Sequence, residues 1–215
     1  MRFTFFFALV TLASASPLSR NDTRFIGRRG NLPEPVNAVI AKQYLAELPI
    51  ALPVVNPPYD RTKFPRWITI DGECDTRKTV LKRDALAQVI VDSQCNPTFS
   101  SWRSDYDGVL ITDRNPVGLD ISHLVSLKEA WQSGAWNWTQ ERRTEFANDL
   151  TRPQLLPVTA MSNRMKGDKD PAKWMPSNRG FRCLYVRAWI QIKHYYGLAV
   201  DEAEKNKLTT LIRNC

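Results

Sequence analysis

The chain has 215 residues, of which 43% are hydrophobic and 24% are charged, and its formal net charge at pH 7 is +8. This length and composition suit one sizeable globular domain with a short appendage. After the N-terminal segment, no stretch approaches the roughly twenty apolar residues of a transmembrane helix, which excludes a membrane-spanning mature chain. The basic charge suits a polyanionic partner such as a nucleic acid, but it also suits a protein that is merely kept soluble, and net charge alone does not separate these interpretations.

Residues 1–15 have the pattern of a secretory signal peptide. Basic Arg2 is followed by an apolar run and by Ala13-Ser14-Ala15, a small-residue cleavage site. Cleavage there removes Arg2, so the net charge falls from +8 to +7. We therefore expect a secreted, extracellular protein, with glycosylation sequons at Asn21 and Asn137.

Residues 16–58 are rich in proline and are expected to form an N-terminal segment with one helix. That helix is predicted over residues 36–48, where apolar residues recur near one face at helical spacing. We expect the main domain to occupy residues 59–215.

Several helices are predicted in the main domain. Thr139 is placed to cap one helix, and Gly197 is placed to end another. A turn-forming cluster at residues 105–108 precedes a short apolar run at residues 109–111. The predicted helices cover residues 79–91, 127–132, 139–149, 181–196 and 201–213.

A short strand is predicted to end at His123, one of only two histidines in the chain. The alternation of Val117, Leu119 and Ile121 indicates the strand and places Asp120 and Ser122 on its opposite face. An acidic side chain and a histidine are therefore expected at one strand end. The other histidine, His194, lies near a helix C-terminus, where a packing or dipole role is expected.

A second strand and a helix are predicted further along the chain. Residues 154–158 form the strand, and the helix begins near Thr159 and carries Asn163 and Lys166 on one face. The helices between residues 127 and 149 would then be an insertion between the two strands. The result is a strand, strand, helix unit with a long first connection.

The four cysteines indicate disulfides, because an even number in an exported chain most often pairs. Three pairings are open. We favour Cys74 with Cys95 and Cys183 with Cys215, since each pair brackets one contiguous segment. A zinc site is disfavoured because the chain has no Cys-x-x-Cys spacing and neither histidine lies beside a cysteine.

An ordered set of motifs runs through the main domain and resembles the HNH nucleases, in particular the secreted branch related to the C-terminal domain of GmrSD restriction endonucleases. The resemblance implies an α+β fold: an HNH (ββα-metal) core with a helical insertion and C-terminal helices, stabilised by disulfides. The motifs are Tyr59-Asp60-Arg61, Cys74-Asp75-Thr76-Arg77, Val80-Leu81-Lys82-Arg83-Asp84, Phe146-Ala147-Asn148-Asp149, Lys166-Gly167-Asp168 and Tyr195-Tyr196-Gly197.

The resemblance also implies roles for single residues. His123 would be the general base, and Gln154 would orient its imidazole. Asn163, with Asp120 or Ser122, would hold a divalent metal ion, most simply Mg²⁺. The residues expected to contact phosphate are Lys166, Arg164 and Arg77.

Four positions depart from the family pattern, and the first is Gln154, a longer amide in place of an asparagine. Ser122 stands where the family has a metal-binding acid, and a neutral hydroxyl is a poor ligand for a hard dication. Arg66 replaces a histidine and Lys78 replaces an acid, so both add positive charge that favours phosphate and opposes metal. Asp120 could take over the metal, directly or through water.

The sequence therefore predicts a secreted, monomeric, metal-dependent endonuclease that acts on DNA or RNA. The alternative is a binding protein that keeps the nuclease fold and its basic surface after losing the metal carboxylate.

Overall fold

The structure is a computed structural model, and it describes residues 31–113 and 118–215. The expected signal peptide, Asn21 and Val117 lie outside the described residues. The α-helices are α1 (Ala38–Glu47), α2 (Thr76–Arg83), α3 (Leu127–Gln132), α4 (Gln140–Ala147), α5 (Ala160–Lys166), α6 (Arg182–Tyr196) and α7 (Glu202–Ile212). The strands are β1 (Thr69–Asp71), β2 (Cys74–Asp75), β3 (Ile90–Val91), β4 (Pro97–Arg103), β5 (Leu110–Asp113), β6 (Leu119–His123) and β7 (Leu155–Thr159). Short 3-10 helices are η2 (Arg61–Lys63), η3 (Ala135–Asn137) and η4 (Arg179–Phe181).

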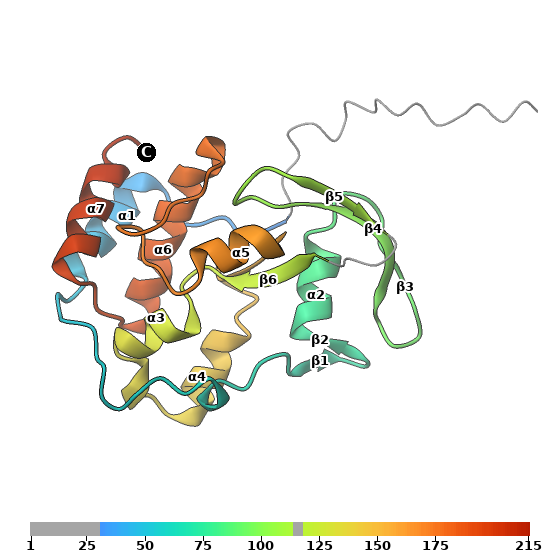
Figure 1. Ribbon diagram of the computed structural model, residues 1–215, viewed down its shortest axis with the longest axis horizontal. Helices are drawn as coiled ribbons and strands as arrows, with labels where there is room; N and C mark the ends of the chain where they lie inside the picture. The colour runs from blue at the N-terminus through green and yellow to red at the C-terminus, as the bar shows by residue number, and fades with distance from the viewer. Residues whose placement is uncertain (1–30, 114–117) are drawn as a thin grey trace, which may run out of the picture.

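The molecule has a helical region and a sheet region, with β6 and α5 between them (Figure 1). The helical region contains α1, α3, α4, α6 and α7, and the sheet region contains α2 and β1 to β5. All strand pairs are antiparallel, in the orders β1-β2, β3-β4-β5 and β6-β7. In the parts of the chain that the structure describes, no helix is long and apolar enough to cross a bilayer.

The strand, strand, helix unit predicted around His123 is confirmed. β6 pairs with β7 so that His123 faces Leu155 and Leu119 faces Thr159. α5 follows β7 at once, because the Thr159 side chain accepts a hydrogen bond from the backbone N–H of Ser162 and caps the helix. α3, η3 and α4 form the insertion between the two strands. A mixed α+β fold with a ββα unit follows from these elements.

The larger hydrophobic core lies in the helical region. It joins buried residues of α1, α3, α4, α6 and α7 with Leu156 and Val158 of β7. α6 ends as expected at Gly197, whose φ of 66° lies in the left-handed region that glycine adopts without strain. Thr139 caps α4, also as expected. The helical region is thus built on one continuous core.

The N-terminal segment is part of that core. Its helix α1 matches the predicted helix closely and buries Ala41, Leu45 and Leu48 against the helical region. Further along the segment, the Val54 N–H donates to Gln132 O and the indole N–H of Trp131 donates to Pro57 O, at 2.8 and 3.0 Å. From α1 onward the proline-rich segment is therefore held along the domain by apolar packing and backbone hydrogen bonds.

The smaller core supports the sheet region. Val80 and Leu81 of α2 pack with Trp102 of β4 and with Leu119 and Leu155 of the β6–β7 pair. The indole N–H of Trp102 donates to the carbonyl of Leu81 at 2.8 Å, which ties β4 to α2. This core fixes α2 against the back of the ββα unit.

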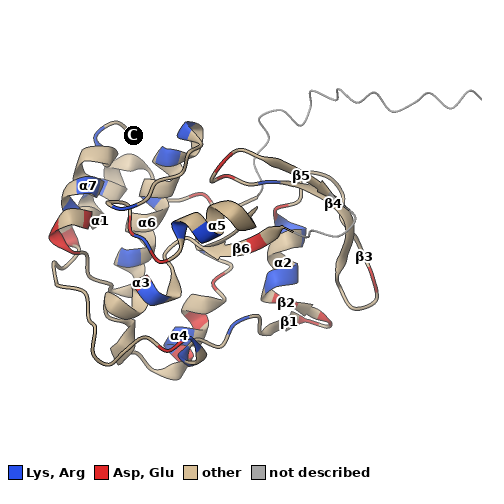
Figure 2. Ribbon diagram, viewed as in Figure 1, with Lys and Arg blue, Asp and Glu red and all other residues tan. Residues whose placement is uncertain are grey.

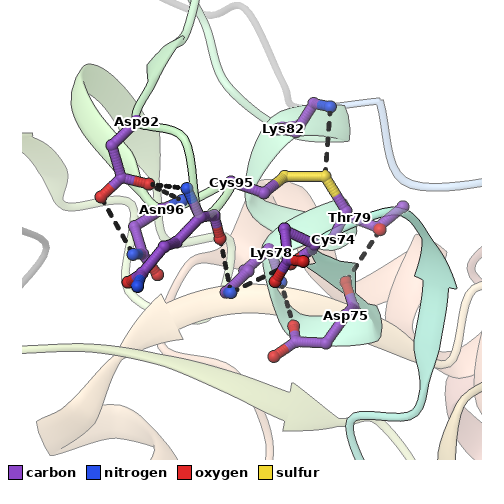
Figure 3. The surroundings of a disulfide bond; sticks show 10 residues. Cys74, Asp75, Lys78, Thr79, Lys82, Asp92, Cys95 and Asn96 are labelled. Atoms are coloured by element: carbon purple, nitrogen blue, oxygen red, sulfur yellow. Dashed lines mark hydrogen bonds between the residues drawn. A yellow bond between two sulfur atoms is a disulfide. The ribbon is translucent and has the colours of Figure 1, made fainter.

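Both predicted disulfides are confirmed. Cys74 pairs with Cys95 and Cys183 with Cys215, over sequence separations of 21 and 32 residues. Figure 3 shows the first bond joining β2 to the loop before β4, beside α2. In the loop-entropy model each bond stabilises the fold by about 3 kcal/mol.

The predicted helix over residues 79–91 is wrong in its second half. α2 starts earlier, where the Asp75 carboxylate caps it by accepting the N–H of Lys78, and it ends at Arg83. Two residues past Asp84 the Leu86 N–H donates to Ser101 O, and Ile90 and Val91 then pair with β4 as strand β3. The β-branched residues at the end of the predicted helix suit this strand better.

Candidate active site

A cavity of about 200 Å³ opens where β6, α3 and α5 meet the segment before β1. It brings together most of the residues that the sequence singled out, although they lie up to 44 positions apart in the chain (Ser122 to Lys166). Their side chains come from the end of β6 and from one face of α5. The residues of the cavity wall used below are Tyr59, Arg61, Ser122, His123, Asn163, Arg164, Lys166 and Asp168.

His123 lies at the end of β6 with its imidazole fixed by the backbone of α4. Its Nε2 is 2.9 Å from the carbonyl oxygen of Ala147. A carbonyl can only accept, so Nε2 carries the proton and the lone pair of neutral imidazole is on Nδ1. The ring of Trp67 stacks on the imidazole at a centroid distance of 5.8 Å. The histidine is therefore held as a tautomer that can accept a proton through Nδ1.

The surroundings of His123 keep it neutral. Burial lowers its pKa to about 3, against a raising effect of the Ala147 carbonyl. The positive charges of Arg66, Lys166 and Arg61 lower the pKa further. The imidazole is thus an available but weak base, and an anion nearby would raise its basicity.

Asp120 and Asn163 lie together beside the cavity. The Asn163 amide donates from Nδ2 to the Asp120 carboxylate at 3.0 Å, so β6 and α5 bring one oxygen ligand each to one place. Because the amide donates through nitrogen, its carbonyl oxygen remains a potential metal ligand. Within the described residues, no cluster of three or more His, Cys, Asp or Glu side chains could hold a metal.

This donor set suits Mg²⁺ better than other common ions, but only as a weak site. Mg²⁺ usually keeps several waters and takes one or two carboxylates plus phosphate oxygens of a substrate. Asp120 and Asn163 provide one carboxylate and one amide oxygen. The residues therefore fit a site that a substrate phosphate completes.

Ser122 is a poorer ligand candidate than Asp120. Its side chain is buried, and its hydroxyl is 3.1 Å from the phenol of Tyr106, which lies in the larger core. Asp120 and Ser122 were expected on one face of β6, but their exposure differs. Ser122 is buried, whereas Asp120 is only half-buried. A carboxylate in place of this hydroxyl would lie at the cavity wall, where the Tyr106 phenol can donate a hydrogen bond to it.

Lys166 was expected to contact phosphate, but its ammonium donates to backbone carbonyls of the protein. Its side chain is only 1% exposed, and its ammonium donates to the carbonyl oxygens of His123 and Gly167 at 3.1 and 3.5 Å. Burial lowers the pKa of this lysine to about 8. Lys166 therefore ties α5 to the end of β6 at the wall of the cavity.

The other predicted cations divide into two kinds. Arg164 is exposed on the cavity wall, where it can reach a phosphate. Arg77 donates to the backbone oxygen of Leu119 at 3.3 Å and stays outside the wall. Lys78 was expected near the site, but its ammonium donates to Glu73 O and Gln94 O beside the first disulfide (Figure 3). Lys78 is thus held by the β1–β2 turn and the disulfide loop and does not line the cavity.

Gln154 does not have the orienting contact that was expected. Its amide bonds both ways with the backbone of Val125, accepting the N–H at 3.1 Å and donating to the carbonyl at 2.9 Å. The imidazole is oriented by Ala147 O and Trp67 instead. A buried amide needs hydrogen-bond partners, and the backbone of Val125 supplies them. Gln154 thus fixes the chain just after His123.

Asp107 is a positioning residue that the sequence analysis missed. One of its carboxylate oxygens accepts hydrogen bonds from Thr159 and Ser162 at 2.5 and 2.6 Å, in the first turn of α5. Burial raises its pKa, but the hydrogen bonds that it accepts, among them those from Ser162 and Thr159, outweigh burial and leave the pKa lowered. The carboxylate therefore holds the start of the helix that carries Asn163. The sequence predicted a turn at residues 105–108. It did not show the contacts of Asp107, because Thr159 and Ser162 lie more than fifty positions further along the chain.

Basic side chains lie on the surface beside the β6–β7 pair, where Lys82 of α2 and Arg164 of α5 are exposed. α2 and α5 both pack against β7, and both carry Lys and Arg without Asp or Glu (Figure 2). Such a surface attracts polyanions.

A ββα unit whose first strand ends in a histidine, and whose helix brings an asparagine to an acid of that strand, defines an HNH-like nuclease domain. Residues 73–211 match the family described as GmrSD restriction endonucleases, C-terminal domain, and the chain belongs to this family. An uncharacterized secreted protein of Arthroderma benhamiae is 48% identical over 157 residues, which cover 73% of this chain and 76% of that protein. No solved structure matches the chain.

Proposed function

We propose that this protein is a secreted, metal-dependent endonuclease that hydrolyses phosphodiester bonds in DNA or RNA as a monomer. The observation that carries the proposal is His123, held by Ala147 O as a neutral imidazole with Nδ1 free of the proton, in one cavity with Asn163. Family membership supports the reaction class. The name of the Arthroderma relative and the two disulfides support secretion.

Each residue has a defined part in the proposed hydrolysis. Nδ1 of His123 takes a proton from the attacking water, while Nε2 keeps its hydrogen bond to Ala147 O. Asp120 and Asn163 would hold Mg²⁺, which when bound stabilises the charge on the phosphate and on the leaving oxygen. Gln154 and Lys166 hold the backbone around His123, and Asp107 holds α5.

A digestion assay with matched histidine variants tests the proposal. We expect the wild type to cleave plasmid DNA or RNA with Mg²⁺ and to lose this activity in EDTA. His123→Ala should lower the rate by about 10²–10⁴-fold, the usual contribution of a positioned base. His194→Ala is the control, since His194 stacks on Tyr44 and contacts Glu47 on the helical region. A wild type inactive with every divalent metal, or equal rates for the two variants, would contradict the proposal.

A second candidate function is nucleic-acid binding without catalysis. Ser122 in place of the family's acid favours it, because its hydroxyl is engaged with Tyr106 and leaves Asp120 as the carboxylate beside Asn163. Binding depends on the basic surface and not on the histidine, so His123→Ala should bind a short duplex as the wild type does, with strong salt dependence. If the wild type binds neither DNA nor RNA at low salt, both functions fail.

A further inference from the structure

The segment before β1, residues 59–68, is called the strap below, and its Tyr59 and Arg61 line the cavity. Its Phe64 is buried and packs against the rings of Tyr59, Trp131 and Phe146, with centroid distances of 6.2 to 6.3 Å. Its carbonyl at Lys63 accepts hydrogen bonds from Gln140 and Arg143 of α4. The strap precedes residues 73–211, the part that matches the family.

Asn148, just after α4, fixes the strap next to His123. Its amide nitrogen donates to Pro65 O at 2.8 Å, and its amide oxygen accepts the N–H of Ile68 at 3.2 Å. These two bonds bracket Arg66 and Trp67. Trp67 has a φ of 59°, an unusual value for a non-glycine residue, and its ring stacks on His123. The end of α4 therefore holds both the imidazole, through Ala147 O, and the strap that covers it.

The strap brings two arginines that form no ion pair among the described residues, although Asp168 lies on the same cavity wall as Arg61. Arg61 lines the cavity, and the Arg66 guanidinium lies 6.0 Å from the Trp67 ring centroid. In the described parts of the chain, neither guanidinium has a carboxylate oxygen within 4 Å. Other arginines are paired with carboxylates, namely Arg83, Arg142, Arg152 and Arg187.

The two guanidiniums also lie close enough to repel. Burial lowers the pKa of Arg66, and the positive charge of Arg61 lowers it further. Both arginines also lower the pKa of His123. An anion between them would relieve this repulsion and restore basicity to the imidazole.

We propose that Arg61 and Arg66 bind the scissile phosphate, so that the strap completes the active site with phosphate ligands from outside the family-matched residues. Guanidinium groups suit this role because their planar forks bind phosphate oxygens through two parallel hydrogen bonds. The inference rests on the proposed function for the identity of the anion as part of a nucleic acid. It assigns to the strap a phosphate contact in place of Lys166, whose ammonium already donates to the carbonyl oxygen of His123.

Inorganic phosphate in EDTA tests the anion site without any catalysis. The variants are Arg61→Gln, Arg66→Gln and the double variant, with Lys63→Gln as control, since exposed Lys63 lies in the same 3-10 helix outside the cavity wall. At phosphate about tenfold above its Kd, the melting temperature of the wild type and of Lys63→Gln should rise by about 3–6 °C over equal ionic strength in NaCl. The double variant should show no phosphate-dependent rise. No rise in the wild type, or an equal rise in the double variant, overturns the proposal.

Cleavage and duplex binding then separate this proposal from the proposed function. Each single variant should lower kcat/KM by about 10- to 100-fold and reduce the salt slope of duplex binding by about one. Arg61→Lys should recover part of the loss, since it keeps the charge but loses the fork. A wild type that shows the phosphate rise but cleaves nothing contradicts the nuclease function and keeps the anion site. An active wild type whose cleavage is unchanged in the double variant overturns the role of the strap.

Discussion

Two buried lysines, one in the helical region and one at the cavity, have opposite electrostatic surroundings. Lys193 and Lys166 both lie about 6 Å or less from the ring of Trp189. Lys193 donates to the carboxylates of Glu129 and Glu204 at 2.7 and 2.8 Å. Burial lowers the pKa of Lys193, but the two carboxylates outweigh it and leave the pKa raised.

Lys166 has only carbonyl oxygens as hydrogen-bond partners, and burial lowers its pKa to about 8. Lys193 is thus paired with two carboxylates, while Lys166 forms no ion pair within the described residues, and Asp168 and Glu129 raise its pKa less than burial lowers it. Charge that the fold does not neutralise costs stability, and a site that binds an anion recovers that cost on binding.

The largest expected effect on stability comes from replacing Lys193, whose charge is paired with Glu129 and Glu204. Lys193→Met leaves Glu129 and Glu204 buried without their cation, so the free energy of unfolding should fall by about 3–5 kcal/mol. Urea unfolding at pH 7 measures it. The double variant Lys193→Met with Glu204→Gln should recover part of the loss. A change below about 1 kcal/mol in the single variant would mean that the network is not important for stability.

A new carboxylate at the cavity should raise the cleavage rate at limiting Mg²⁺. Ser122→Asp adds a carboxylate next to His123, and Tyr106 can donate a hydrogen bond to it. At limiting Mg²⁺ the cleavage rate should rise at least about tenfold, equivalent to 1.4 kcal/mol. Ser122→Asn, of similar size but neutral, is the control. Equal Mg²⁺ titration curves for the wild type and Ser122→Asp would show that Asp120 already suffices.

The burial of His123 and the positive charges near it also predict a pH dependence of stability. The pKa of His123 is about 3 in the folded protein, against about 6.5 for an unperturbed histidine. Between these values the unfolded chain binds a proton that the folded chain does not, so stability falls as the pH falls from about 6.5 to 3. The slope from this one group is at most about 1.4 kcal/mol per pH unit.

Unfolding in urea at pH 7, 6, 5 and 4, in EDTA, compares the wild type with His123→Gln. The variant lacks the titrating group and should lose less stability on acidification. Parallel curves for the two proteins would contradict the lowered pKa.

The smallest effect is expected for the lysine at the cavity. Lys166→Met removes one hydrogen bond to His123 O but also removes the cost of burying a charge, so the unfolding free energy should change by no more than about 1 kcal/mol. The same substitution at Lys193 is the matched control. If Lys166→Met destabilises as strongly as Lys193→Met, the contrast between the two sites is wrong.

The sequence alone determined the ββα unit, both disulfides and the group of residues at the cavity. Alternating apolar residues before His123, the cap at Thr159 and the glycine at the end of α6 act through nearest neighbours along the chain. Cysteines that bracket one segment need only that segment to fold back. The helix predicted over residues 79–91 failed because pairing with β4 outweighs local helix preference.

The tertiary structure alone decided which partner each polar side chain at the site takes. Gln154, Lys166 and Lys78 all bond to backbone carbonyls that no spacing pattern marks, because a carbonyl exists at every residue. His123 is oriented by a carbonyl 24 positions away, and the strap is held by an asparagine 83 positions from Pro65. Most hydrogen bonds join donor and acceptor atoms about 2.7–3.2 Å apart. The distances between residues far apart in the chain are set when separate segments pack. The local sequence pattern therefore cannot predict these hydrogen bonds.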